Sequence, residues 1–158
     1  MTRRQHLQDI LHQALLTTVS EGIFVRKTFV MSQQQNYPRP FAKAEIMAES
    51  FEYDRDESNG AFLDNYSGVV QFGIYAGVKT QVQDTGDNAL LEAECERVIN
   101  ILHEALHNYD YPDAVLDNGA HLLIQSVYVT GLVPAILDNE MTGNILLEGV
   151  IEYSHYKS

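Results

Sequence analysis

The sequence predicts an α+β domain built on a mixed, mostly antiparallel β-sheet with two helices packed on one face. Two segments show the three-to-four-residue spacing of apolar side chains that is typical of amphipathic helices. The remaining segments alternate apolar and polar residues, as half-buried strands do. The expected order is α-β-β-β-α-β-β. Because the strands come mostly in adjacent pairs, we expect antiparallel hairpins, and helices on one face of such a sheet form an α+β sandwich.

The first helix is predicted over Arg3 to Ser20, where the apolar side chains repeat along one face. Thr2 and Gln5 have the spacing of a capping box at its start. Gly22 is expected to end it, because glycine adopts the left-handed conformation that closes many helices. The helix should therefore lie with its apolar face on the sheet.

Three strands are expected next. The first is predicted between Ile23 and Met31, followed by a polar turn at residues 33–36. The second runs from Phe41 to Phe51 and alternates cleanly, so that its two faces differ in character. One face carries Ala42, Ala44, Ile46 and Ala48, and the other, solvated or facing a partner, carries Lys43, Glu45, Met47 and Glu49. The third strand lies between Val69 and Val78, after an acidic loop predicted at residues 52–65.

The second half of the chain begins with a turn and helix cap at residues 84–88. The second helix is predicted over Ala89 to Asn108, with an apolar stripe that places Cys95 in the core. A loop at residues 110–119 leads to a strand from Leu122 to Thr130. Pro134 cannot occupy a central strand, so residues 131–143 are expected to form a connection or an edge. The closing strand is predicted over Asn144 to Tyr156.

Composition limits the classes of function. The 158 residues have the length of one domain, and we expect residues 1–158 to form one. With 22 acidic and 10 basic side chains the formal net charge is −12. Direct binding to nucleic acid or to an anionic membrane is not expected, since both need a basic patch. No bilayer-spanning run or secretory signal is visible, and a single cysteine is consistent with synthesis in a reducing cytoplasm.

His103-Glu104-Ala105-Leu106-His107 matches the H-E-x-x-H motif of zinc proteases. Histidines four residues apart share a helix face and can bind one zinc ion, while the glutamate polarises a bound water. The third histidine of the extended motif is missing, because the chain has Asp110 and Asp113 where that pattern requires Gly and His, but Asp110, Asp113 or Asp117 could bind the ion instead. Both histidines are predicted to point away from the apolar stripe. An exposed helix face therefore explains them, and a small zinc-dependent hydrolase remains the alternative.

The layout of the whole chain resembles the tail-terminator (tail-completion, minor tail) proteins of long-tailed bacteriophages. An N-terminal helix leads through Tyr37-Pro38-Arg39-Pro40 into a strand, and a long acidic loop follows. The text Val-Gln-Phe-Gly-Ile-Tyr-Ala-Gly at residues 70–77 is similar to that family's central strand. The closing text Leu-Leu-Glu-Gly-Val-Ile-Glu-Tyr at residues 146–153 is similar to its last strand.

The resemblance implies a structural protein of the virion, assembled in the bacterial cytoplasm, and not an enzyme. Members of that family form a ring, typically a hexamer, that caps the tail tube and presents a surface to the head connector. The implied partners are further copies of the chain, the tail tube protein and a head-completion or connector protein. No catalytic residue, cofactor or metal ion is expected. Our predicted assembly interface comprises Lys43, Glu45, Met47, Glu49, Asp54, Arg55, Asp56, Glu57, Phe62 and Tyr66. An adaptor module of another kind, such as a part of a secretion apparatus, is a third reading.

Overall fold

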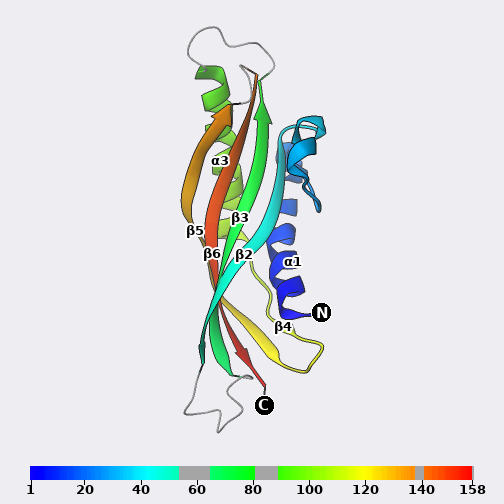
Figure 1. The fold of residues 1–158 in the computed structure, drawn as a ribbon, viewed down its shortest axis with the longest axis vertical. Coiled ribbons are helices and arrows are strands. Elements are labelled where there is room, and N and C mark those ends of the chain that lie inside the picture. Colours follow the sequence, from blue (N-terminus) through cyan, green and yellow to red (C-terminus); the bar gives the residue numbers. More distant parts are fainter. Residues whose placement is uncertain (54–64, 81–88, 138–140, 158) are drawn as a thin grey trace.

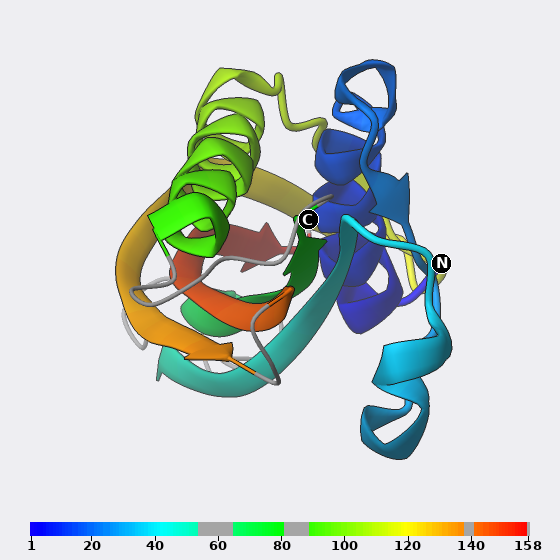
Figure 2. The same cartoon turned by 90° about the horizontal axis from the view of Figure 1, so that it is seen from above.

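The computed structural model describes residues 1–53, 65–80, 89–137 and 141–157, with the backbone alone for residues 134–137. One mixed six-stranded sheet, in the order β1-β2-β3-β6-β5-β4, curls around its long axis (Figures 1 and 2). Within the described residues, two α-helices lie on the same side of this sheet (Figure 2). The predicted α+β class is confirmed. The sheet has one strand more than expected, because residues 114–115 form a short strand within the predicted loop.

The elements have the following bounds along the chain: α1 (Arg3–Leu16), η1 (Val19–Glu21), β1 (Phe24–Val25), η2 (Met31–Asn36), β2 (Phe41–Tyr53), β3 (Tyr66–Lys79), α3 (Ala89–Asn108), β4 (Ala114–Val115), β5 (His121–Leu137) and β6 (Thr142–Tyr156). The 3-10 helices are labelled η. The predicted turn and cap at residues 84–88 lie outside the described residues.

Helix α1 begins with the predicted capping box, in which Thr2 and Gln5 satisfy each other's backbone N–H groups. The α-helix ends at Leu16, earlier than predicted. The hydroxyls of Thr17 and Thr18 donate to the carbonyls of Ala14 and Leu15, and the Thr17 N–H also reaches Ala14. Such local bonds compete with the α-helical pattern, so the chain continues as 3-10 helix η1 until Gly22, whose φ is 88°.

The predicted strand between Ile23 and Met31 is largely wrong. Only β1 forms, paired in parallel with the start of β2, and the expected turn is the 3-10 helix η2. Aromatic packing holds this segment instead of strand pairing. The Arg26 guanidinium lies 3.6 Å from the ring centre of Tyr37, and the Phe29 ring stacks on Tyr75 at 5.0 Å. Tertiary contacts therefore override the apolar alternation.

Strands β2, β3, β6 and β5 form the antiparallel body of the sheet. Strand β2 continues to Tyr53 and so enters the predicted loop by two residues, and β3 begins at Tyr66, earlier than predicted and directly after that loop. Residues 54–64 of that loop lie outside the described residues. Residues 131–143 were predicted to form a connection or an edge strand. Strand β5 continues through Pro134 to Leu137 and no described strand pairs with its other side there, so Pro134 lies in an edge strand. A register shift between Val133 and Ile136 accommodates the proline.

The core is a single hydrophobic cluster shared by both helices and the inner face of the sheet. Helix α3 contributes five buried side chains of the predicted stripe: Leu91, Cys95, Val98, Leu102 and Leu106. Burial raises the pKa of the Cys95 thiol, with smaller contributions from neighbouring glutamates. A Cβ at Gly68 would lie 2.1 Å from the ring of Tyr153, so glycine is required where that ring crosses β3. Neither described helix combines the length and the apolar character needed to cross a membrane.

Candidate assembly surface

The predicted interface strand, β2, contains a β-bulge that changes which side chains share a face. Ile46 pairs with Phe72, but Glu49 pairs with Val70, so three steps on β2 match two steps on β3. Since side chains alternate with a period of two, the extra residue moves every following side chain to the other face. Glu49 therefore joins buried Val70 on the inner face. The prediction that Glu49 lies on one face with Lys43, Glu45 and Met47 is wrong for this reason.

Glu49 anchors helix α1 to β2 from this inner position. Its carboxylate pairs with the guanidinium groups of Arg3, at 3.2 Å, and of Arg4, and it accepts a hydrogen bond from the Tyr153 hydroxyl at 3.1 Å. The Glu49 side chain is 6% exposed. Desolvation raises the pKa of Tyr153, and the nearby Arg3 opposes this rise. Glu49 is thus a structural ion-pair centre in the folded chain.

Tyr66 is also buried rather than presented to a partner. Its ring stacks on His155 at 4.5 Å, and its hydroxyl accepts a hydrogen bond from Arg3 at 3.0 Å. Of the other predicted interface residues, the five in the acidic loop lie outside the described residues: Asp54, Arg55, Asp56, Glu57 and Phe62.

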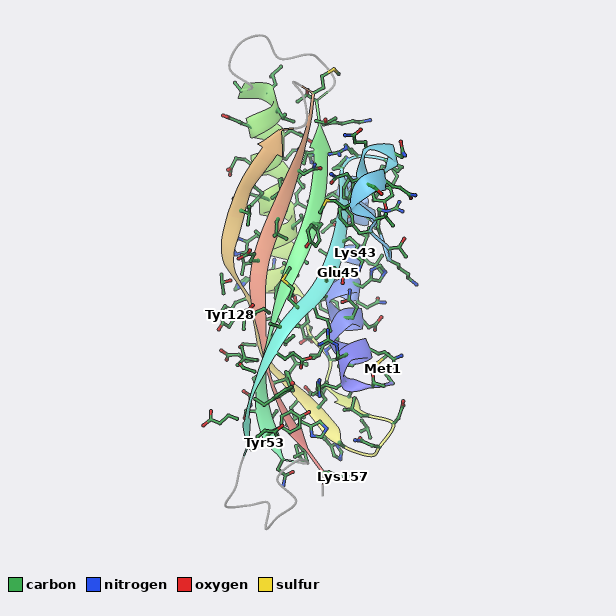
Figure 3. All side chains as sticks on the ribbon, viewed as in Figure 1. Met1, Lys43, Glu45, Tyr53, Tyr128 and Lys157 are labelled. Atoms are coloured by element: carbon green, nitrogen blue, oxygen red, sulfur yellow. The ribbon has the colours of Figure 1, made fainter. Side chains whose placement is uncertain are left out.

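Lys43 lies on the strand as predicted but is buried, contrary to the expected solvated face. Its Nζ donates to Glu45 Oε1 at 2.6 Å and to the Ala44 carbonyl at 2.8 Å. Lys43 and Glu45 lie next to α1 (Figure 3). Met47 is half-buried and lies against Gly73, where a Cβ would approach its methyl group to 2.5 Å.

The free edge of β2 is sealed by a side chain that the sequence did not single out. The Gln8 amide donates to the Ala44 carbonyl at 2.5 Å and accepts from the Ile46 N–H at 3.1 Å. A single amide thus satisfies two backbone groups as a neighbouring strand would. β1 covers the start of the same edge by pairing with Phe41 and Ala42. Three elements therefore protect this edge: β1, α1 and the charged side chains of β2 itself.

A groove of about 810 Å³ runs between α1 and this edge, and we call it the basic groove. Its cationic side chains are Arg4, Arg26, Lys27 and Lys43, and its carboxylates are Asp9 and Glu45; His12 also lines it. The groove thus gathers four of the ten Lys and Arg residues of a chain with a net charge of −12. Burial lowers the pKa of His12, and nearby Lys27 lowers it further.

Strand β5, near the opposite end of the sheet, is protected by other and fewer means: the Asp113 carboxylate accepts a hydrogen bond from the Ile124 N–H at 2.8 Å, and Pro134 and three register shifts interrupt the regular strand. β4 pairs only with His121 and Leu122, and from there to Leu137 no other strand beside β6 pairs with β5 within the described residues. No charged residue occurs between Leu122 and Leu137. Tyr128 and Leu132 expose more than two-fifths of their surface. Long uncharged edges are templates for pairing with another chain.

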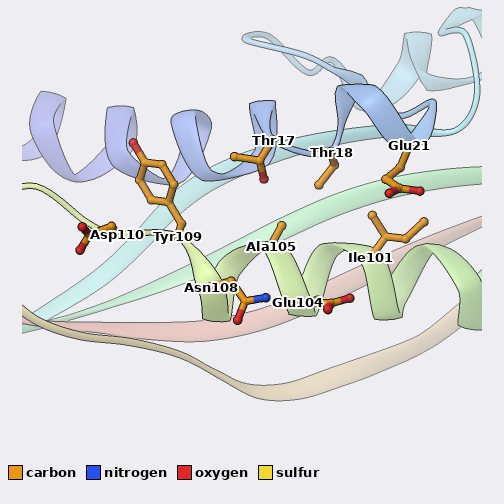
Figure 4. A pocket seen from close by; sticks show the side chains of 9 residues that line it. All are labelled: Thr17, Thr18, Glu21, Ile101, Glu104, Ala105, Asn108, Tyr109 and Asp110. Carbon is orange, nitrogen blue, oxygen red and sulfur yellow. The ribbon is translucent and has the colours of Figure 1, made fainter.

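The outer surface of α3 is acidic, and we define this acidic helix surface by the exposed Glu92, Glu96 and Glu104. The helix has one cation, Arg97, which donates to both carboxylate oxygens of Glu94, at 2.6 and 3.0 Å. A second groove, of about 510 Å³, separates α3 from the end of α1 (Figure 4). Its charged lining residues are Glu21, Glu104 and Asp110, without a cation. The α3 side of the molecule is therefore negatively charged.

His103, Glu104 and His107 lie on this exposed side of α3, as the helical spacing predicted. Within the described part of the chain, no group of three or more His, Cys, Asp or Glu side chains is placed to hold a metal ion. In this motif the glutamate acts on the bound water and does not bind the zinc ion. His103 and His107 therefore supply two of the three protein ligands that a catalytic zinc site has.

No protein-family model matches the chain, and no curated protein is detectably similar to it.

Proposed function

We propose that this chain is a structural assembly protein of the tail-terminator class. Its copies would form a ring, with six the expected number, that caps the tail tube of a long-tailed bacteriophage and joins it to the head. Its partners would be further copies, the tube protein and a head-completion or connector protein. The proposal includes assembly in the host cytoplasm and a final place at the head-proximal end of the tail.

The uncharged edge of β5 is the observation that supports self-assembly. Monomeric proteins protect exposed edges with charged side chains, prolines, β-bulges or covering elements. Here charged side chains and α1 protect β2, whereas β5 carries no charge from Leu122 to Leu137 and relies on Pro134, its register shifts and the bond from Ile124 to Asp113. We expect a neighbouring copy to cover this edge. The layout of helices and strands shared with tail terminators supports the choice of this class among assembly proteins.

Native mass spectrometry over a range of protein concentrations, without chelator, tests the proposal. A discrete ring-sized species without a metal adduct is the expected result. His103→Ala should leave this species unchanged, because the proposal gives the histidine no role. A chain that remains monomeric at every concentration would overturn the proposal. A monomer with one zinc ion that His103→Ala abolishes would favour the hydrolase alternative.

A further inference from the structure

We propose that the basic groove binds the acidic helix surface of a neighbouring copy, so that two different surfaces of the same chain form the ring contact. This inference rests on the proposed function, because it assumes that the copies associate. It identifies where they do so and by which chemistry.

Charge dictates where such copies can meet. A chain with a net charge of −12 repels its own copies at long range. Association is therefore favoured where cations of one copy face carboxylates of the next. In the basic groove Arg4 is paired with Glu49 and the buried Lys43 with Glu45, so Arg26 and the exposed Lys27 are the cations that remain for a neighbour. Helix α3 supplies Glu92, Glu96 and Glu104, and its one arginine is already paired.

The positions of the two surfaces allow repeated addition of copies. In Figure 2, α3 and β5 lie on one side of the molecule, and α1 with β1 lies on the other. The basic groove lies on the side of α1 that carries β2, away from α3. A contact between two different surfaces is head-to-tail, and it produces a closed ring when the rotation between copies closes. Such a contact also brings the uncharged β5 edge toward the neighbour, because β5 lies beside α3.

The groove has suitable dimensions and chemistry for a helix face. Its volume of about 810 Å³ accommodates several side chains, and α3 offers a 20-residue helix with charged residues on its outer surface. Helices commonly bind partners by placing one face in a groove. Complementary charges chiefly set the orientation and the association rate of such contacts.

Charge-reversed variants test this pairing. The groove variant combines Gln5→Glu with Lys27→Glu. Lys27 is exposed, and a glutamate at position 5 retains the oxygen that accepts the Thr2 N–H. The helix variant combines Glu96→Lys with Glu104→Lys, both at exposed positions. Gln71→Glu with Lys79→Glu is the control, because it makes the same charge change as the groove variant at exposed positions of β3.

We expect the groove variant and the helix variant each to need at least tenfold more protein to form rings than the native chain or the control. An equimolar mixture of the two should form rings again, since alternating copies place reversed groove against reversed helix and native groove against native helix. A chain carrying all four substitutions should also form rings, and this result does not depend on an even number of copies. Circular dichroism and urea unfolding verify that every variant is folded.

The outcomes separate the two proposals. If the native chain and both variants form rings at the same concentration, the inference is overturned while the proposed function stands. If both variants lose the ring but neither the mixture nor the fourfold variant regains it, the pairing of these two surfaces is likewise overturned. If the native chain itself never associates, the proposed function fails and the inference fails with it.

Discussion

The β2 edge and the β5 edge of the sheet are protected to different degrees. At the β2 edge, Gln8 hydrogen-bonds to the free backbone groups of Ala44 and Ile46, and Glu49 ties Arg3 and Arg4 of α1 to the same strand. At the β5 edge, no charged residue occurs between Leu122 and Leu137, and no second strand pairs with it beyond Leu122 in the described chain. Intramolecular contacts thus cover more of the β2 edge, while the β5 edge is covered near Ile124 by Asp113 and beyond it retains the character of a contact surface.

The difference shows that edge protection is a property of single side chains and not of strand length. β2 and β5 are both long strands with a two-residue partner at one end. What separates them is helix α1, which lies along β2 and supplies an amide and two guanidinium groups to it. The four predictions below test this contrast.

Removing Glu49 should have the largest effect on folding. Glu49→Ala leaves Arg3 and the Tyr153 hydroxyl without their buried carboxylate partner. Breaking a buried ion pair from one side costs about 3 kcal/mol, and we expect a loss of this size in the free energy of unfolding. Urea unfolding measures it, with Glu52→Ala, exposed on the same strand, as the control. Equal effects of the two substitutions would show that Glu49 does not anchor α1.

Charging the β5 edge should affect association and leave the monomer folded. Thr130→Lys together with Leu132→Lys introduces at exposed positions the residue that natural edges use against pairing. We expect association to weaken about 100-fold, which corresponds to about 2.7 kcal/mol, in sedimentation over a dilution series. Ala48→Lys together with Ser50→Lys, at exposed positions of β2, is the matched change and should have no such effect. Equal weakening by both changes would remove the contrast between the edges.

Gln8→Ala should expose part of the backbone at the β2 edge. It leaves the Ile46 N–H without its side-chain partner, while the Ala44 carbonyl loses one donor and keeps the hydrogen bond from Lys43 Nζ. Since one partly buried backbone N–H group loses its only side-chain partner, we expect the free energy of unfolding to fall by about 1–2 kcal/mol. Thermal unfolding would show this, with Gln13→Ala on the exposed face of α1 as the control. An increase in aggregation of the Gln8 variant would indicate that the edge has become available for pairing.

The smallest expected effect is on pH dependence at the basic groove. Burial and the charges of Lys27 and Lys43 lower the pKa of His12 in the folded chain, while Asp9 opposes them. The unfolded chain then binds more protons than the folded chain, so the contribution of His12 is complete above about pH 6.5 and is lost as the pH falls toward the folded value. His12→Asn should flatten the loss of stability below pH 6.5, by less than about 1 kcal/mol because the ring is partly solvated. His103→Asn is the control, and an unchanged slope for His12→Asn would contradict this account.

Much of the fold was predictable because it depends on local periodicity. The capping box of Thr2 and Gln5, the core stripe with Cys95 on α3 and the closing strand follow from residues that lie near each other in sequence. The strand predicted after residue 22 failed because its aromatic side chains pack on Tyr75 and Phe41, which are distant in sequence. The fate of Pro134, edge or connection, could only be decided by the observed strand order.

The candidate site was less accessible to prediction. Lys43, Glu45 and Met47 were correctly placed on one face of the strand. The bulge after Ile46 moves Glu49 to the inner face, and no residue pattern in the sequence predicts that bulge. Gln8 gave no signal, because a glutamine on a helix has many possible partners. The uncharged run from Leu122 to Leu137 is visible in the sequence. Its position at an edge, which suggests a contact surface, follows only from the strand order.

The sequence by itself determined the α+β class, the two helices and the residues that form the core, because each of these depends on side-chain spacing along the chain. Only the tertiary structure decided which strands lie at the edges, which face Glu49 takes, and which cations meet. Arg4 of α1, Lys27 after β1 and Lys43 of β2 form one groove although they are separated in sequence. The physical reason is that pairing register and the docking of α1 arise from long-range contacts, and one extra residue in a strand is enough to exchange its two faces.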